Sequence, residues 1–177
     1  MISEELLQLI IESQTRPLLD NLVKREQQIP ESMHRAVIVT GIRRCGKSTL
    51  LKSLNKSTDS LFINFEDPRL EGFSVNDFFK LEKIAETQKS KNFIFDEIQN
   101  VTGWEKYVNT AVERGLKIYI TGSNAKLLSK ELGTKLTGRY LQVELFPFSY
   151  NEFLKQQESH PSFASFESYI ETGGFPE

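Results

Sequence analysis

The sequence predicts an α/β fold in which helices cover both faces of a parallel sheet. From residue 36 onward, short apolar and β-branched segments alternate with polar segments of helical spacing. The apolar segments are nearly continuous, as in Phe93-Ile94-Phe95, and such runs are typical of strands buried on both faces. Regular alternation of strands and helices favours a parallel sheet over an α+β arrangement with segregated elements.

The first predicted element is a helix at the N-terminus. Ser3 precedes two glutamates and an apolar run, a pattern typical of a capped helix start. Pro17 interrupts the helical spacing, which apolar residues between positions 18 and 23 restart. We therefore predict a helical N-terminal segment over residues 1–30.

Five strands follow in the predicted core, residues 31–146. They are expected at residues 36–40, 61–65, 92–96, 117–121 and 140–145. The segments between them have helical spacing or turn signals at residues 47–54, 75–86 and 104–114, and less evenly at residues 127–136. Residues 147–177 are expected to form a helical extension after the core.

Length and charge limit the class of protein. The 177 residues suit one domain with a short appendage. The 22 Lys and Arg residues against 24 Asp and Glu residues give a net charge of −2, which offers no electrostatic support for nucleic-acid binding but leaves a local basic patch open. The single cysteine excludes an internal disulfide and a cysteine-rich zinc site, and His34 and His160 have no partners at metal-ligand spacing.

Membrane and secretory signals are not found in the sequence. The longest apolar runs are only a few residues, whereas a membrane span needs about 20. The first residues lack the basic region that precedes the apolar core of a signal peptide. We therefore expect a cytoplasmic protein without a membrane partner.

A phosphate-binding loop is the most specific motif. Residues 41–48 match G-x-x-x-x-G-K-[ST] at every fixed position and lie between a predicted strand and a predicted helix. Gly41 and Gly46 allow the backbone to wrap closely around phosphate, and the helix N-terminus adds N–H groups and the positive end of its dipole. Lys47 is expected to contact the β- and γ-phosphates, and the Ser48 hydroxyl is expected to ligate Mg²⁺.

The remaining loop positions complete the predicted nucleotide site. Arg43 and Arg44 add positive charge, although solvated side chains are the simpler interpretation for both. Cys45 is either a reactive thiol, since positive neighbours lower a thiol pKa, or a tolerated small residue. The predicted nucleotide-binding residues are Gly41, Arg43, Arg44, Cys45, Gly46, Lys47, Ser48 and Thr49.

Two acids lie at the end of the predicted strand 92–96. Asp96 is expected at the carboxyl edge of the sheet, in the same crevice as the phosphate loop, where it can hold Mg²⁺ directly or through water. The adjacent Glu97 can orient and polarise a water molecule for in-line attack on the γ-phosphate. A solvent-exposed Asp-Glu pair would be the default interpretation in a chain without a phosphate loop.

Further polar residues are candidates for the same site. Ser123 and Asn124 follow the fourth predicted strand, and one can contact the γ-phosphate or the attacking water while the other caps a helix. Arg139 precedes the fifth strand and can act as an arginine finger in cis or in trans, or pair with a surface carboxylate. The candidate catalytic residues are therefore Glu97, Lys47, Asn124 and Arg139, and the candidate metal ligands are Ser48 and Asp96.

In this order, the motifs resemble those of a P-loop ATPase of the AAA+-like, additional-strand type. More narrowly, they resemble bacterial and archaeal ATPases whose ATPase domain precedes a C-terminal domain of the DUF4143 type. The resemblance covers residues 36–177, and its matching segments are residues 40–51, 64–70, 95–99, 104–105, 121–124, 136–139, 147–153 and 173–177. Only the phosphate loop is specific by itself, and the ordered set carries the resemblance.

The resemblance implies a three-layer αβα P-loop NTPase fold with a five-stranded parallel sheet of order 5-1-4-3-2. It implies ATP and Mg²⁺ as ligands, with Lys47, Ser48, Asp96 and Glu97 at the nucleotide. Family members continue beyond the Gly-Gly-Phe-Pro-Glu segment, so we expect this chain to be part of a longer protein. A protein or DNA partner is expected to bind through this C-terminal region, and assembly into an oligomer is left open.

Two functions are compatible with these residues. The leading hypothesis is a Mg²⁺-dependent ATPase, and the alternative is a nucleotide-gated switch or scaffold with negligible turnover. A GTPase is disfavoured because no Asn-Lys-x-Asp motif occurs at a useful place. A small-molecule kinase is disfavoured because Glu97 adjoins Asp96, the predicted metal ligand, and no Arg-rich lid is found.

Large aromatic residues, among them Trp104, Phe146, Phe148, Tyr150 and Phe153, are expected to be core residues rather than a stacking platform for adenine or nucleic-acid bases.

Overall fold

The centre of the computed structural model is a five-stranded parallel sheet of order β2-β3-β4-β1-β5. The structure describes residues 2–15, 22–32, 34–54, 59–122, 136 and 138–176. The strands are β1 (Ala36–Thr40), β2 (Ser60–Asn64), β3 (Asn92–Asp96), β4 (Lys117–Thr121) and β5 (Tyr140–Glu144). This order is the predicted order 5-1-4-3-2 taken from the other edge, so the predicted fold class is confirmed. The observed β2 begins and ends one residue earlier than predicted, and β5 ends one residue earlier.

The parallel pairing brings the carboxyl ends of the strands to one edge. Thr40 at the end of β1 lies opposite Glu144, and Asn64 at the end of β2 lies opposite Asp96. The strand β4 lies between β1 and β3. Segments that follow β1, β3 and β4 therefore emerge side by side, although they are far apart in the sequence.

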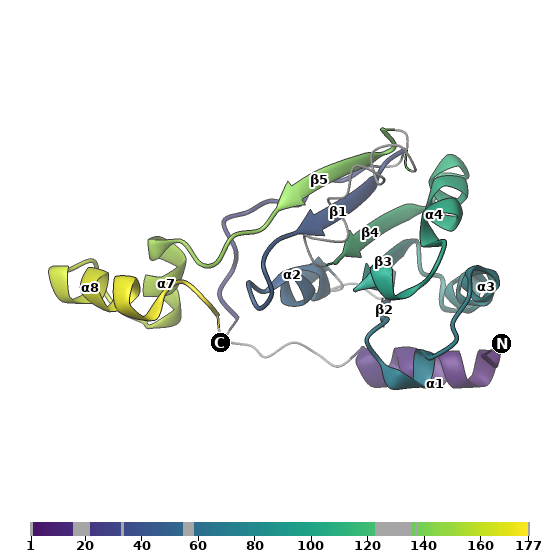
Figure 1. Ribbon diagram of the computed structural model, residues 1–177, viewed down its shortest axis with the longest axis horizontal. Helices are drawn as coiled ribbons and strands as arrows, with labels where there is room; N and C mark the ends of the chain where they lie inside the picture. The colour runs from purple at the N-terminus through teal and green to yellow at the C-terminus, as the bar shows by residue number, and fades with distance from the viewer. Residues whose placement is uncertain are drawn as a thin grey trace.

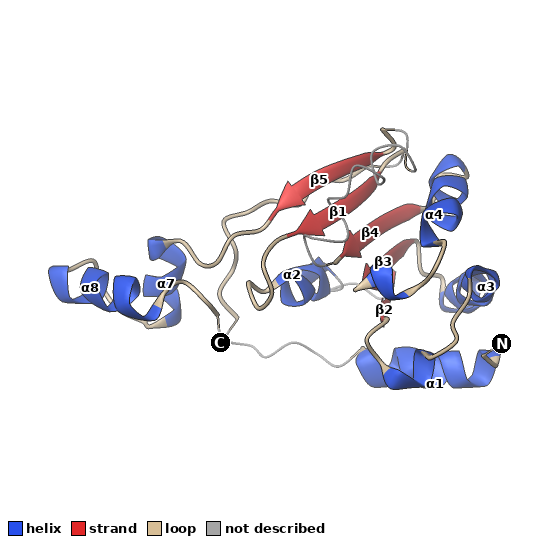
Figure 2. Cartoon of the chain, in the orientation of Figure 1, coloured by secondary structure: helices blue, strands red, loops and turns tan. Residues whose placement is uncertain are grey.

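Helices cover both faces of the sheet (Figures 1 and 2). One face carries α1 (Glu4–Gln14), α3 (Phe78–Gln88) and α4 (Trp104–Glu113), and the other carries α2 (Lys47–Leu54). Successive strand residues point to opposite faces, so Ala36 and Ile38 join the first core while Val37 and Val39 join the second. The described part of the core region also contains the short 3-10 helices η1 (Pro68–Leu70), η2 (Val75–Asp77) and η3 (Ile98–Asn100).

The N-terminal segment differs from the prediction. The helix α1 begins after Ser3, whose side chain accepts a hydrogen bond from the Leu6 backbone N–H at 3.2 Å, and it ends at Gln14. Residues 22–30, in contrast, form no helix. Polar groups of these residues bond to the C-terminal part of the chain instead. The backbone N–H of Glu26, for example, donates to the Glu152 carboxylate at 2.7 Å. Such tertiary contacts readily override a weak helical preference.

The C-terminal extension consists of α7 (Tyr150–Gln156) and α8 (Phe163–Thr172), which stand away from the sheet in Figure 1. The helix α8 has no buried residue, and Phe163 is 82% exposed. Among the aromatic residues expected in the core, Trp104, Phe148 and Phe153 are buried, but Phe146 is 65% exposed. No helix in the described part of the chain is long and apolar enough to cross a membrane.

Candidate functional site

The predicted phosphate loop joins the end of β1 to the start of α2. Gly41 has φ +151° and Gly46 has φ +92°, backbone conformations that residues with a Cβ rarely adopt. A Cβ added to Gly41 would lie 2.2 Å from the carbonyl oxygen of Leu145. The first glycine is therefore required by the chain that follows β5 as well as by the expected approach of phosphate.

The Lys47 side chain folds back across this loop. Its Nζ donates hydrogen bonds to the carbonyl oxygens of Gly41 at 3.1 Å and Ile42 at 2.8 Å, and the residue is buried. The ammonium group thus lies within the turn formed by the loop. A phosphate oxygen would offer it a stronger, charge-assisted hydrogen bond than these two neutral carbonyls.

A buried carboxylate connects the loop to the neighbouring strands. Asp96, at the end of β3, accepts hydrogen bonds on Oδ1 from the Ser48 hydroxyl at 3.0 Å and from the Thr121 hydroxyl. Its Oδ2 is buried and has no hydrogen-bond partner in the part of the chain that the structure describes. Burial raises the pKa of Asp96, and the charge of Glu97 adds to the rise, against the lowering by the two hydroxyls.

Glu97 has a backbone conformation that is rare for a residue with a side chain. Its φ is +52°, and its N–H donates to the Thr121 Oγ1 at 3.1 Å. The Glu97 carboxylate accepts a hydrogen bond from the side-chain amide of Gln99. Strained backbone of this kind concentrates at functional sites, where surrounding contacts hold it in place.

The structure brings together Lys47, Ser48, Asp96 and Glu97, but not Arg139. The carbonyl oxygen of Arg139 accepts from the N–H of Ala36, the first residue of β1, at 2.9 Å. The phosphate loop follows the last residue of β1, so the length of the strand, about 16 Å, separates the two. The guanidinium pairs with Glu113 at 2.6 Å. A cis role for Arg139 is thus not supported, and the surface ion pair is observed.

The other predicted site residues differ in their exposure to solvent. Arg43, Arg44 and Thr49 are exposed. Cys45 is buried, and its Sγ donates to the Leu145 carbonyl at 3.4 Å. Burial raises the Cys45 thiol pKa more than the nearby positive charges lower it, so the structure opposes the reactive-thiol interpretation. Ser123 and Asn124 lie outside the described residues.

Three residues of this region were not identified from the sequence. Thr121 bonds to both Asp96 and Glu97, and its signal was a polar residue at the end of a buried strand. Gln99 contacts Glu97, and only its proximity in the sequence pointed to it. Arg25 donates to the carbonyl oxygen of Cys45 at 2.8 Å, and no local sequence pattern distinguishes it from other charged residues.

A parallel sheet of this order, with a phosphate-loop motif after β1 and an acid at the end of β3, defines an ATPase-like P-loop nucleotide-binding protein. Residues 33–154 match the family model described as an AAA domain. The match covers more than half of the sequence, and the chain belongs to this AAA family.

Two curated relatives are similar to this chain. One, an uncharacterized protein of Methanocaldococcus jannaschii, is 37% identical over an aligned length of 183 residues, and the match covers 90% of this chain and 42% of the relative. The other, an uncharacterized protein of Haemophilus influenzae, is 39% identical over an aligned length of 155 residues, and the match covers 78% of this chain and 39% of the relative. The chain thus spans about two fifths of the length of these relatives.

Two solved structures are also similar. The structure of C. elegans PCH-2 has a TM-score of 0.46 at 18% identity, and the match covers 79% of this chain and 41% of that one. A structure on katanin self-assembly has a TM-score of 0.48 at 11% identity, and the match covers 68% of this chain and 43% of that one.

Proposed function

We propose that this chain binds ATP together with Mg²⁺ at the phosphate loop and hydrolyses ATP to ADP and phosphate. The observation that carries the proposal is the 3.0 Å hydrogen bond from Ser48 to Asp96. This bond joins the last residue of the loop motif, in the first turn of α2, to the acid at the end of β3. The two residue types expected to share a magnesium ion are therefore already adjacent, and Lys47 lies beside them.

The donor set fits Mg²⁺. This cation prefers oxygen ligands and is commonly held by one or two protein groups together with phosphate oxygens and water. The Ser48 hydroxyl and the Asp96 carboxylate supply such oxygens, and Asp96 Oδ2 has no other partner among the described residues. A nearby cation would also favour the ionised form of Asp96 and so offset its raised pKa. When bound, Mg²⁺ supplies neutralisation of phosphate charge.

The side chains of this chain have separate roles in the proposal. Lys47 exchanges the carbonyl oxygens of Gly41 and Ile42 for phosphate oxygens and holds them in place. Glu97, whose backbone N–H is fixed by Thr121, orients a water molecule and accepts its proton. The water oxygen forms a bond to the γ-phosphorus while the bond from that phosphorus to the ADP oxygen breaks.

The test compares two site variants with two surface controls. Lys47→Ala is expected to weaken nucleotide binding by roughly 10- to 100-fold, the value of a hydrogen bond to a charged group. Glu97→Gln is expected to keep nucleotide affinity and lose roughly 100-fold or more of the turnover. Lys106→Ala and Glu86→Gln remove the same kinds of charge from exposed positions on α4 and α3 and should change neither quantity.

Nucleotide affinity is measured by calorimetric titration, and turnover by phosphate release at saturating Mg²⁺-ATP. A wild-type chain that binds no nucleotide would refute the proposed site. Full turnover in Glu97→Gln would refute the role of that carboxylate while leaving the binding site intact.

A second candidate function is a nucleotide-gated switch or scaffold with negligible turnover. The observation that favours it is the hydrogen bond from Gln99 to the Glu97 carboxylate, which holds this group within its own turn. Gln99→Ala releases the carboxylate. Nucleotide binding without phosphate release, in both the wild type and this variant, would select the switch. In either case we propose that the nucleotide drives or gates a protein or DNA partner.

A further inference from the structure

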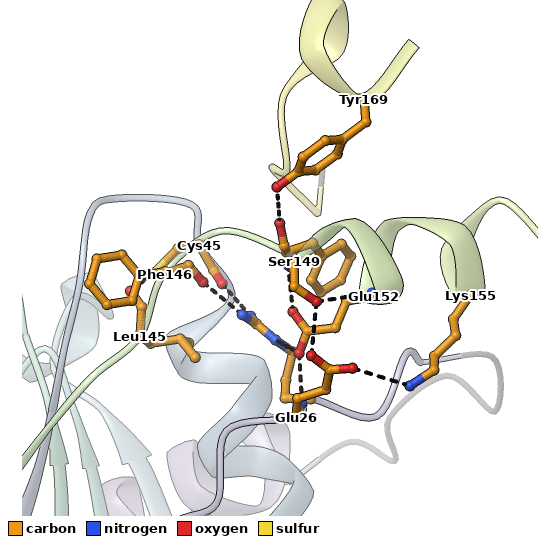
Figure 3. Close-up of polar contacts among 10 residues, drawn as sticks. Glu26, Cys45, Leu145, Phe146, Ser149, Glu152, Lys155 and Tyr169 are labelled. Carbon is orange, nitrogen blue, oxygen red and sulfur yellow. Dashed lines mark hydrogen bonds and ion pairs between the residues drawn. The ribbon is translucent and has the colours of Figure 1, made fainter. Parts of the chain in front are cut away.

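One arginine, Arg25, connects the phosphate loop to the C-terminal extension. Figure 3 labels the three residues that accept its hydrogen bonds, Cys45, Phe146 and Glu152. The Arg25 side chain is only 9% exposed and makes three separate donations. Nη1 donates to the Cys45 carbonyl at 2.8 Å, Nη2 to the Phe146 carbonyl at 2.6 Å, and Nε to Glu152 Oε1 at 2.9 Å. The guanidinium also lies 4.9 Å from the centroid of the Phe148 ring.

Glu152 on α7 is the counter-ion of this arginine, and its side chain is 4% exposed. Its carboxylate also accepts from the backbone N–H groups of Glu26 at 2.7 Å and Ser149 at 3.0 Å. Burial by itself would raise the pKa of Glu152, but these N–H groups and Arg25 outweigh it, so the pKa lies below its ordinary value. The ionised carboxylate thus fixes the position of Arg25 more firmly than a solvated surface ion pair would.

The contact with Cys45 has a consequence for the loop backbone. The Cys45 carbonyl and the Gly46 N–H belong to the same peptide unit, which is planar and trans, so the two groups point in opposite directions. Because Arg25 holds the carbonyl oxygen, the Gly46 N–H points away from Arg25. Glycine has a wide choice of backbone conformations, so a peptide next to Gly46 gains most from such an external contact.

We propose that Arg25 is a positioning residue of the phosphate loop. It fixes the Cys45–Gly46 peptide so that the Gly46 N–H is presented to the phosphates, and Glu152 fixes Arg25 in turn. This inference rests on the proposed function, because it assumes that the loop binds phosphate. Arginine suits the position because its planar guanidinium can donate to three acceptors in fixed directions, whereas the single ammonium of lysine cannot match all three.

The main test uses Arg25→Met in the 177-residue chain. The substitution keeps an apolar stem and removes all three donors. Arg114→Met is the matched control, because Arg114 also pairs with one glutamate, Glu82, but caps the C-terminal end of α4, which covers the opposite face of the sheet from α2. In the ligand-free protein, the ¹⁵N relaxation order parameter of the Gly46 amide is expected to fall from about 0.85 towards 0.6 in Arg25→Met. It should not change in Arg114→Met.

The second measurement is nucleotide affinity. The Kd for Mg²⁺-ADP is expected to rise about tenfold in Arg25→Met and to stay at the wild-type value in Arg114→Met. Arg25→Lys keeps the positive charge opposite Glu152 and is expected to fold. Its Kd for Mg²⁺-ADP is expected to lie above that of the wild type and no higher than that of Arg25→Met. This second variant decides the question if Arg25→Met does not fold.

Unchanged Gly46 order and unchanged Mg²⁺-ADP affinity in the folded variants would overturn the inference, even if thermal stability falls, because Arg25 would then serve folding alone. The two readouts also separate this inference from the proposed function. A wild-type chain that binds no Mg²⁺-ADP refutes the nucleotide site, whereas the Gly46 order parameter in the ligand-free protein still decides whether Arg25 positions the loop.

Discussion

Replacing Gly41 by alanine tests whether the phosphate loop depends on close contact with the chain after β5. The new Cβ would lie 2.2 Å from the Leu145 carbonyl oxygen and 2.9 Å from the Cys45 Sγ, and real Cβ atoms essentially never come within 3.0 Å of another heavy atom. The loop or the segment after β5 must therefore move by roughly 1 Å. That segment does not yield easily, because the Leu145 N–H bonds to the Thr40 carbonyl at 2.7 Å.

The expected cost has two parts. Overpacking typically costs about 1–3 kcal/mol, and a backbone conformation such as φ +151° costs a residue with a Cβ about 1–3 kcal/mol more. Gly41→Ala should thus lower the free energy of unfolding by about 2–6 kcal/mol. For a chain of this size, the melting temperature would fall by roughly 5–20 °C.

Gly115→Ala is the matched control for this prediction. Gly115 also has a positive φ, +83°, but a Cβ there would meet nothing within 4 Å. Its substitution should therefore cost only the backbone strain, roughly 1–2 kcal/mol. Both variants are measured by urea denaturation in the absence of nucleotide. Equal losses in the two variants would refute the argument, because the contact with Leu145 would then contribute nothing.

Two further predictions concern the ionised groups. Asp96→Asn should raise the stability of the ligand-free protein at pH 7 and abolish the Mg²⁺ dependence of nucleotide binding. The pKa of Asp96 is raised in the folded state, so the free energy of unfolding falls as the pH rises above the pKa that Asp96 has in the unfolded chain. The ionised carboxylate therefore costs stability at pH 7, and asparagine removes that cost. A drop in the urea midpoint at pH 7 would contradict this. Glu152 has a lowered pKa, so its contribution is present above its unfolded pKa and is lost as pH falls through the folded one. Between pH 6 and pH 3 the wild-type midpoint should therefore fall more steeply than that of Glu152→Gln, and parallel curves would disprove the contribution.

The core strands could be predicted because their patterns are local. The bounds of β1, β3 and β4 agree with the prediction, since apolar β-branched runs between polar segments mark buried strands clearly. The sheet order, by contrast, came from the resemblance and not from periodicity. The helical N-terminal segment was predicted from apolar spacing that ends at position 23, and residues 16–21 lie outside the described residues. Such spacing carries no information about the partners of residues 22–30, such as Glu152, which lies 126 positions away from Glu26.

The candidate site was predictable where a motif is continuous in the sequence. The loop and the acidic pair were found in this way, but the hydroxyl of Thr121 and the guanidinium of Arg25 act across 25 and 20 positions. Of the alternatives for Arg139, the cis role is opposed by its position before a strand. A residue that precedes a parallel strand lies at the amino edge of the sheet, so the strand prediction itself already opposed a cis role at the carboxyl edge.

Two segments that are distant in the sequence contact the phosphate loop at Gly41 and Cys45. The chain after β5 closes against Gly41 and accepts from the Cys45 thiol through the Leu145 carbonyl. Arg25, from the N-terminal segment, occupies the Cys45 carbonyl and reaches α7 through Glu152. The conformation of the loop is therefore not a property of its eight-residue pattern alone. If Arg25 favours the loop conformation that binds nucleotide, the coupling is reciprocal, so bound nucleotide strengthens the contact between Arg25 and α7 in turn.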